Sequence, residues 1–157
     1  MQTDDDKNFL LRLYVDVHEA GLIGNGWPVT ETQSFLEQQF AAQYHSYGTL
    51  YPDAEFQIVE YRGQAIGRLG WQRDESECLI IDIALLAEYR NHGMGRQLIR
   101  NIQESAAVSA VPVSLHVEHG NPAIRLYQYL GFEVVEDQGV HLLMHFHPVS
   151  RVKRDDR

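Results

Sequence analysis

The 157-residue sequence predicts a single α/β (α+β) domain with a mixed, mostly antiparallel sheet and a central parallel β-α-β crossover. Two helical patterns come first and two short strand patterns follow. A long apolar run then leads through a glycine-containing loop into a strongly amphipathic helix. Because this length suits one compact domain, we assign residues 1–150 to it. Residues 1–7 form a polar N-terminal segment, and residues 151–157 form a charged tail.

The first third of the chain has the pattern of two helices. Apolar residues within 9–17 recur at helical spacing, and we expect this helix to stop in the glycine-rich loop at 21–26. Thr30 and Gln33 fit a capping box, which predicts the start of a second helix at this point. A proline-containing break at 51–53 is expected to end it.

The middle of the chain changes to strand patterns. Residues 55–61 and 64–71 flank Arg62 and Gly63, which predicts a β-hairpin. Residues 78–86 form an almost continuous apolar run, which is typical of a central strand covered on both faces. The later elements follow in order: a helix from Gly93, a strand over 111–117, a short helix opened by Asn121 and Pro122 and closed by Gly131, and a hairpin of 132–136 with 140–146.

Composition narrows the function classes. The net charge of −9 disfavours binding to nucleic acid or to anionic membranes, and it suits a cationic partner such as an amine. No apolar run approaches the roughly 18 residues that a membrane span needs. Cys78 is the only cysteine, so an internal disulfide is excluded and a reducing, cytoplasmic location is expected.

The loop between the central strand and its helix, residues 90–96, has the composition of an anion site. Gly93 and Gly95 let the backbone curl, while the helix dipole and two arginines add positive charge. The Gly-Lys-Ser/Thr of a P-loop is missing, and Leu98 stands where a dinucleotide motif has its third glycine. A phosphate or pyrophosphate site is predicted, with a ligand-free strand–helix turn as the structural alternative.

Two motifs carry a family resemblance. Arg90-x-x-Gly93-x-Gly95 after an apolar strand resembles the acetyl-CoA signature of the Gcn5-related N-acetyltransferase (GNAT) superfamily. Residues 121–132, Asn-Pro-Ala-Ile-Arg-Leu-Tyr-Gln-Tyr-Leu-Gly-Phe, resemble the closing helix of that superfamily. Both motifs occur in the family's order, and the layout matches over residues 9–146. The chain is therefore similar to the GNAT superfamily, and Asp82-Ile-Ala-Leu-Leu with Leu115-His-Val-Glu118 resembles a bacterial-type branch of it.

The resemblance implies acetyl-CoA as cosubstrate and no metal. It implies that the strands at 78–86 and 111–117 splay apart, and that the main chain of Ile83 and Leu85 bonds the pantetheine arm as an added strand would. Asn121 matches a family asparagine that contacts the cofactor, although Gly120 occupies the strictly counted position. Arg90 and Arg96 would supply charge, and the pyrophosphate would lie on the amides of Asn91, His92, Gly93, Met94, Gly95 and Arg96.

The resemblance also implies a set of proton-transfer groups. Tyr127 matches the family's general acid, and a phenol with a pKa near 10 is a plausible donor to a thiolate. Its structural alternative is a packing residue. The base is open between His116, Asp82, Glu118 and a water molecule. Asp82 has the structural alternative of pairing with an arginine such as Arg68.

These expectations combine into one function. The chain would transfer acetyl from acetyl-CoA to a primary amine by direct attack in a ternary complex. The alternative is a non-catalytic CoA- or acyl-CoA-binding module with the same cradle. Homodimers are common among relatives, and the sequence holds no motif that decides the oligomeric state or the acceptor.

Two further features favour structural roles, and a third departs from the family's layout. Residues 141 and 145 of the histidines at 141, 145 and 147 lie about 13 Å apart along one strand, too far to share a metal ion. Cys78 is expected to be an inert buried thiol. Relatives begin with a strand before the first helix, whereas only the polar segment 1–7 is available here.

Overall fold

The computed structural model describes residues 3–148 and has the predicted α+β architecture. The chain forms two compact units, one comprising residues up to Gln72 together with Asp82–Gly95, the other comprising Arg73–Ile81 and the residues from Arg96 onward. Strand β3 (Cys78–Leu85) contributes its first half to the second unit and its second half to the first. Hydrogen-bonded neighbours follow the order β1-β2-β3 and then β3-β4-β6-β5.

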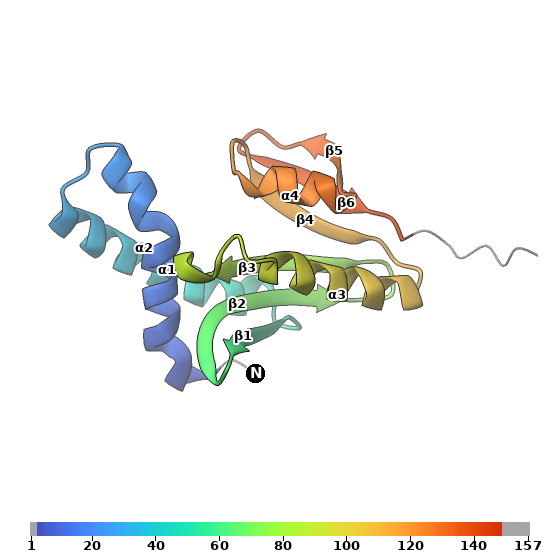
Figure 1. Ribbon diagram of the computed structural model, residues 1–157, viewed down its shortest axis with the longest axis horizontal. Helices are drawn as coiled ribbons and strands as arrows, with labels where there is room; N and C mark the ends of the chain where they lie inside the picture. Colours follow the sequence, from blue (N-terminus) through green and yellow to red (C-terminus); the bar gives the residue numbers. More distant parts are fainter. Residues whose placement is uncertain (1–2, 149–157) are drawn as a thin grey trace, which may run out of the picture. The chain divides into compact units, whose positions relative to one another are not determined.

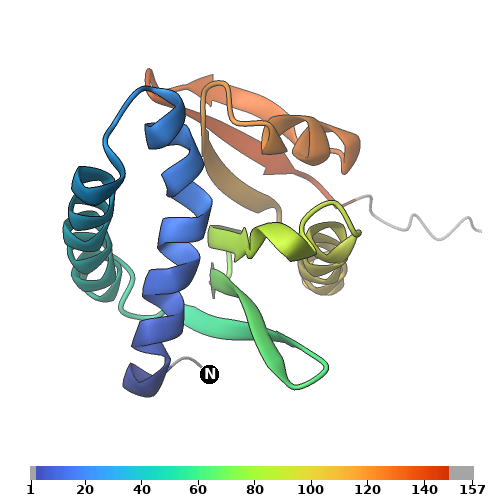
Figure 2. The same ribbon diagram turned by 60° about the vertical axis from the view of Figure 1, so that its left-hand side comes forward.

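The first unit combines two long helices with a hairpin. Helices α1 (Lys7–Gly24) and α2 (Val29–Leu50) pack against each other and bury Leu10 and Leu36 almost completely (Figures 1 and 2). Strands β1 (Glu55–Tyr61) and β2 (Gln64–Arg73) are antiparallel. The two residues that join them have positive φ angles, 51° and 77°, as a tight two-residue hairpin turn requires.

The second unit is built around one parallel crossover. Its elements are α3 (Met94–Val108), β4 (Val113–Glu118), α4 (Ala123–Tyr129), β5 (Glu133–Asp137) and β6 (His141–Phe146). The β3–β4 ladder is parallel and comprises three residue pairs, ending at Ile80 and Leu115. Helix α4 lies against β4 and β6 (Figure 1).

The sequence correctly predicts the element order, and local signals misplace some boundaries. Helix α1 continues through Gly21 and ends at Gly24, within the glycine-rich segment 21–26 where its stop was expected. The predicted capping box is wrong. The N-cap of α2 is Pro28, two residues before Thr30, and the Thr32 hydroxyl donates to the Pro28 carbonyl at 2.8 Å. Thr30 therefore lies inside the first turn of the helix.

The N-terminal segment is partly helical. Residues Asp4–Asp6 form a 3-10 turn that runs directly into α1. No strand precedes α1 between residue 3 and that helix. The predicted tail at 151–157 lies outside the described residues. In the part of the chain that the structure covers, no helix combines the length and the apolar character needed to cross a membrane.

Gly67 allows strand β2 to pack closely against β3. A Cβ atom at Gly67 would overlap the Ala84 carbonyl oxygen and lie 2.6 Å from Leu85 Cδ2. We expect Gly67→Ala to lower the free energy of unfolding by roughly 1–3 kcal/mol, because a rigid backbone atom must move. Urea denaturation measures this loss.

Helix α2 offers a matched control for that substitution. Gly48 has nothing within 4 Å of a built Cβ, so Gly48→Ala should raise the free energy of unfolding by up to about 1 kcal/mol. If Gly67→Ala is as stable as the wild type, the close approach of β2 and β3 does not exist in solution.

Candidate functional site

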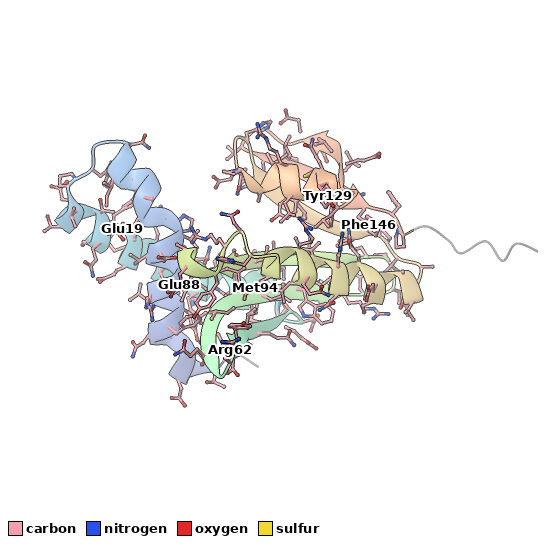
Figure 3. The ribbon with its side chains drawn as sticks, viewed as in Figure 1. Glu19, Arg62, Glu88, Met94, Tyr129 and Phe146 are labelled. Atoms are coloured by element: carbon pink, nitrogen blue, oxygen red, sulfur yellow. The ribbon has the colours of Figure 1, made fainter. Side chains whose placement is uncertain are left out.

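The segment that joins β3 to α3 carries the candidate anion site. After β3 a 3-10 turn, Ala87–Tyr89, leads into an exposed loop whose residues Asn91 and Gly93 have positive φ angles of 62° and 83°. Asparagine and glycine tolerate this left-handed conformation better than other residues. Helix α3 then begins at Met94, which Figure 3 labels at the helix entrance together with Glu88 of the turn.

Helix α1 anchors this loop through a single carboxylate. Oδ2 of Asp16 accepts a hydrogen bond from the Ala87 backbone N–H at 2.7 Å and another from Nη2 of Arg90 at 3.2 Å. Arg90 Nε also donates to the Leu85 carbonyl at 2.8 Å. Both side chains of the ion pair are more than a third exposed, so the pair orients the loop more than it stabilises the fold.

This geometry changes the interpretation of two charged residues. Arg90 was predicted to supply charge to a phosphate, whereas the structure places its guanidinium on Asp16 and on the end of β3. Asp16 is a further functional candidate that is not recognisable from the sequence. It lies 74 residues before its partner, within an ordinary amphipathic helix pattern, so no local signal marked it.

Gly95 provides the test of whether the loop fits a pyrophosphate. It lies in the first turn of α3, where glycine is less stable than alanine by about 0.5–1 kcal/mol. A Cβ there would meet only Leu85 Cδ1, at the ordinary distance of 3.9 Å. The protein's own packing therefore does not require glycine at this position. A ligand that approaches the backbone closely would require it, so the loop fits the predicted group.

The other residues predicted for the cofactor lie on both sides of this loop. Ile83 and Leu85 are on β3, half-buried and buried respectively, while Asn91 and His92 are exposed. Arg96 is exposed, with its guanidinium carbon 5.0 Å from the centre of the Tyr129 ring.

Asn121 has a local role at the entrance of α4. Its carboxamide oxygen accepts a hydrogen bond from the Ala123 N–H at 2.9 Å, which helps to satisfy the exposed amides of the helix start. Pro122 stands just before the helix and not at its first position as predicted. Gly120, which occupies the family's counted position, has a positive φ of 78°.

The predicted acid and one predicted base lie in the second unit. Tyr127 is on α4, 8% exposed, with its ring edge-on to Phe132 at 5.9 Å between centroids. His116 is exposed on β4, opposite Leu143 of β6. Glu118, the further candidate, is exposed near His141, with 3.9 Å between Oε1 and Nε2. Tyr127 thus contributes to packing, and this contact is compatible with either predicted role.

Asp82 lies in the first unit and has the ion-pair partner that the sequence suggested. Nη1 of Arg68 is 3.6 Å from Oδ2 of Asp82. The Arg68 side chain is 5% exposed and the Asp82 side chain is 25% exposed, so the carboxylate is the accessible end of the pair. Burial raises the pKa of Asp82, while the charges of Arg68 and His18 oppose that rise.

Two further groups have structural surroundings. Cys78 is buried, and this burial raises the pKa of its thiol above the usual value, as expected for an unreactive cysteine. Within residues 3–148, no group of three or more His, Cys, Asp or Glu side chains is arranged to hold a metal ion.

Comparison with known families decides the classification. The family model described as "Acetyltransferase (GNAT) domain" matches residues 52–134, just over half of the chain, from β1 to the start of β5. The chain belongs to the GNAT acetyltransferase family. The match includes the loop before α3 and the α4 helix, which are the two segments that suggested the family from sequence. A search of curated proteins found no match.

Solved structures share the GNAT fold at low sequence identity. PaiA N-acetyltransferase from Thermoplasma acidophilum, solved in complex with coenzyme A, has a TM-score of 0.71 and 14% identity, covering 93% of this chain and 95% of its own. PH1933 from Pyrococcus horikoshii OT3 has a TM-score of 0.67 and 17% identity, covering 94% and 93%. The Escherichia coli ribosomal-protein-S18-alanine N-acetyltransferase has a TM-score of 0.57 and 19% identity, covering 66% and 76%.

Proposed function

We propose that this GNAT protein transfers an acetyl group from acetyl-CoA to a primary amine by direct attack in a ternary complex. The observation that carries the proposal is the glycine at position 95. The protein's own packing leaves this position open, and it directly follows a loop ordered by Asp16. Family membership and a coenzyme A complex among the similar structures support the same ligand.

The amides of residues 91–96 would hold the pyrophosphate. Successive N–H groups at a helix entrance, with the positive end of the helix dipole, suit such an anion. Arg96 would add a whole positive charge, whereas Arg90 would act indirectly by ordering the loop on Asp16. The backbone groups of Ile83 and Leu85 would pair with the amides of the pantetheine arm, as an added strand does.

When bound, acetyl-CoA supplies an activated acyl group with a good leaving thiolate. Two residues of the chain would then donate or accept protons. Tyr127 would give its hydroxyl proton to the departing sulfur, and Asp82 would accept a proton from the acceptor ammonium. We favour Asp82 over His116 because its carboxylate is partly shielded from water and has a fixed ion-pair partner, while His116 is exposed on β4.

Calorimetric titration with acetyl-CoA tests the proposal, followed by an amine screen that detects released thiol. Micromolar binding together with thiol release that depends on an added amine is the expected result. Binding without turnover on protein N-termini, lysine, polyamines, amino acids and amine antibiotics would favour a CoA-binding module. If the wild-type protein does not bind acetyl-CoA, the proposed function is wrong.

A further inference from the structure

The carboxylate of Asp82 is paired with a buried arginine that also contacts two aromatic rings. The guanidinium carbon of Arg68 lies 5.2 Å from the ring centre of Tyr47 and 4.6 Å from that of Phe56. These two rings are stacked, with centroids 5.6 Å apart and planes inclined by 14°. We call Arg68, Asp82, Tyr47 and Phe56 the arginine cluster.

Gly70 makes room for this arrangement. It lies opposite Phe56 in the β1–β2 ladder, and a Cβ at Gly70 would come within 2.5 Å of Phe56 Cε1 and 3.6 Å of the Asp82 backbone nitrogen. The missing side chain therefore allows the Phe56 ring to lie over β2. The guanidinium of Arg68 contacts this ring and lies 3.6 Å from the Asp82 carboxylate.

The arginine cluster is more than apolar packing. Among residues 3–148, Arg68 Nε is a buried nitrogen without a hydrogen-bond partner. Burying a guanidinium with incomplete hydrogen bonding is costly, and an apolar side chain of similar volume is often as stable or more stable at such a position. The charge is therefore explained poorly by fold stability and better by what it does to Asp82.

The groups that face Asp82 come from three elements. Arg68 on β2 and His18 on α1 favour its charged form, as does the backbone N–H of Ile83. Tyr47 on α2 also faces the pair, and burial raises the pKa of its phenol, so it stays neutral at ordinary pH. Burial of Asp82 acts against ionisation, which makes the nearby positive charge of Arg68 important for keeping the carboxylate anionic.

We propose that Arg68 is a positioning residue that holds Asp82 as an oriented, ionised carboxylate for the acceptor amine. This inference rests on the proposed function. In that reaction the ammonium gives one proton to the Asp82 carboxylate, and the freed nitrogen lone pair forms the bond to the acetyl carbon. As the carbon–sulfur bond breaks, the nitrogen loses its second proton to solvent and the thiolate takes the Tyr127 proton. Solvent then returns a proton to Tyr127, and Asp82 releases its proton to solvent, so the net reaction releases one proton.

The pH dependence of kcat/KM tests this role. Activity that needs ionised Asp82 is lost as the pH falls through the pKa of Asp82. Arg68→Met keeps an unbranched side chain beside the two rings and removes the charge. A nearby opposite charge lowers a carboxyl pKa by about 1–3 units, and Arg68→Met removes that charge. The acidic limb of the pH profile, where kcat/KM falls as the pH is lowered, should therefore move to higher pH by a similar amount. Arg68→Lys, which keeps a charge, should show a smaller move, and the KM for acetyl-CoA should not change.

Arg100→Met is the matched control, because Arg100 is an exposed arginine on α3 outside the arginine cluster. Its acidic limb should coincide with that of the wild type. A wild-type limb in folded Arg68→Met would overturn the positioning role while leaving the acetyltransferase function intact. Absence of turnover in the wild type would instead overturn the proposed function.

If Arg68→Met does not fold, an NMR pH titration of the wild-type protein tests the positioning role instead. The carboxyl carbon of Asp82 and the side-chain nitrogens of Arg68 should titrate together, with the midpoint of the acidic limb. Arg68 signals that stay constant through that midpoint would overturn the proposal. An acidic limb that survives Asp82→Asn and disappears in His116→Gln would also overturn it, because it would assign the base to His116.

Discussion

Tyr127→Phe is expected to lower kcat by about 10²–10⁴ while leaving the affinity for acetyl-CoA unchanged. The substitution removes only the hydroxyl group, so the edge-on contact with Phe132 at 5.9 Å is retained and the fold should persist. Without the Tyr127 phenol, the departing thiolate would lose its proposed proton donor. Steady-state kinetics, combined with calorimetric titration of each variant, separates the loss of turnover from a loss of binding.

Tyr129→Phe is the matched control on the same helix. Tyr129 is 66% exposed, and its ring would still face Arg96, so this variant should keep wild-type kcat. Wild-type turnover in Tyr127→Phe would assign Tyr127 to packing and leave another group or water as the proton donor.

Substitution of Gly95 is expected to move stability and affinity in opposite directions. Gly95→Ala should raise the free energy of unfolding by up to about 1 kcal/mol, because alanine is the better helix former and its Cβ meets only one ordinary contact. The same Cβ would stand in the path of a pyrophosphate. We expect at least about a tenfold loss of acetyl-CoA affinity, since crowding a close contact typically costs more than 1 kcal/mol.

Thermal unfolding and calorimetry on one preparation measure both effects. Gly48→Ala, the control in α2, should be more stable with unchanged affinity. The Gly93→Glu, Gly95→Glu double variant should abolish binding, because it adds two negative charges and forces a non-glycine residue to a φ of 83°. Unaltered affinity in Gly95→Ala would show that no ligand approaches this turn.

Features set by neighbouring residues were predictable from the sequence. The Arg62-Gly63 turn, the apolar β3 and the Gly93 loop each depend on a few consecutive side chains, and the structure has them where predicted. The predicted start of α2 is wrong. Thr30 and Gln33 have the spacing of a capping box, but the structure has Pro28 as the N-cap and Thr30 inside the helix.

Features that depend on distant pairs were harder to predict. The contact of Arg90 with Asp16 joins residues 74 positions apart, and nothing in the sequence near either one indicates the other. The sequence did suggest the Arg68–Asp82 pair, because an isolated carboxylate in an apolar strand needs a partner. The contact of the Arg68 guanidinium with the Tyr47 and Phe56 rings could not be predicted from sequence, since it depends on how α2 packs over β1.

Because Asp16 orders the glycine loop, the loop's conformation depends on a residue outside its own strand–helix unit. A peptide containing only β3, the loop and α3 would carry every residue of the family signature, yet it would lack the carboxylate that receives the Ala87 N–H and the Arg90 guanidinium. Grafting the loop into another strand–helix unit would therefore transfer its sequence without its shape. The transferable unit is the loop together with the face of α1 that carries Asp16.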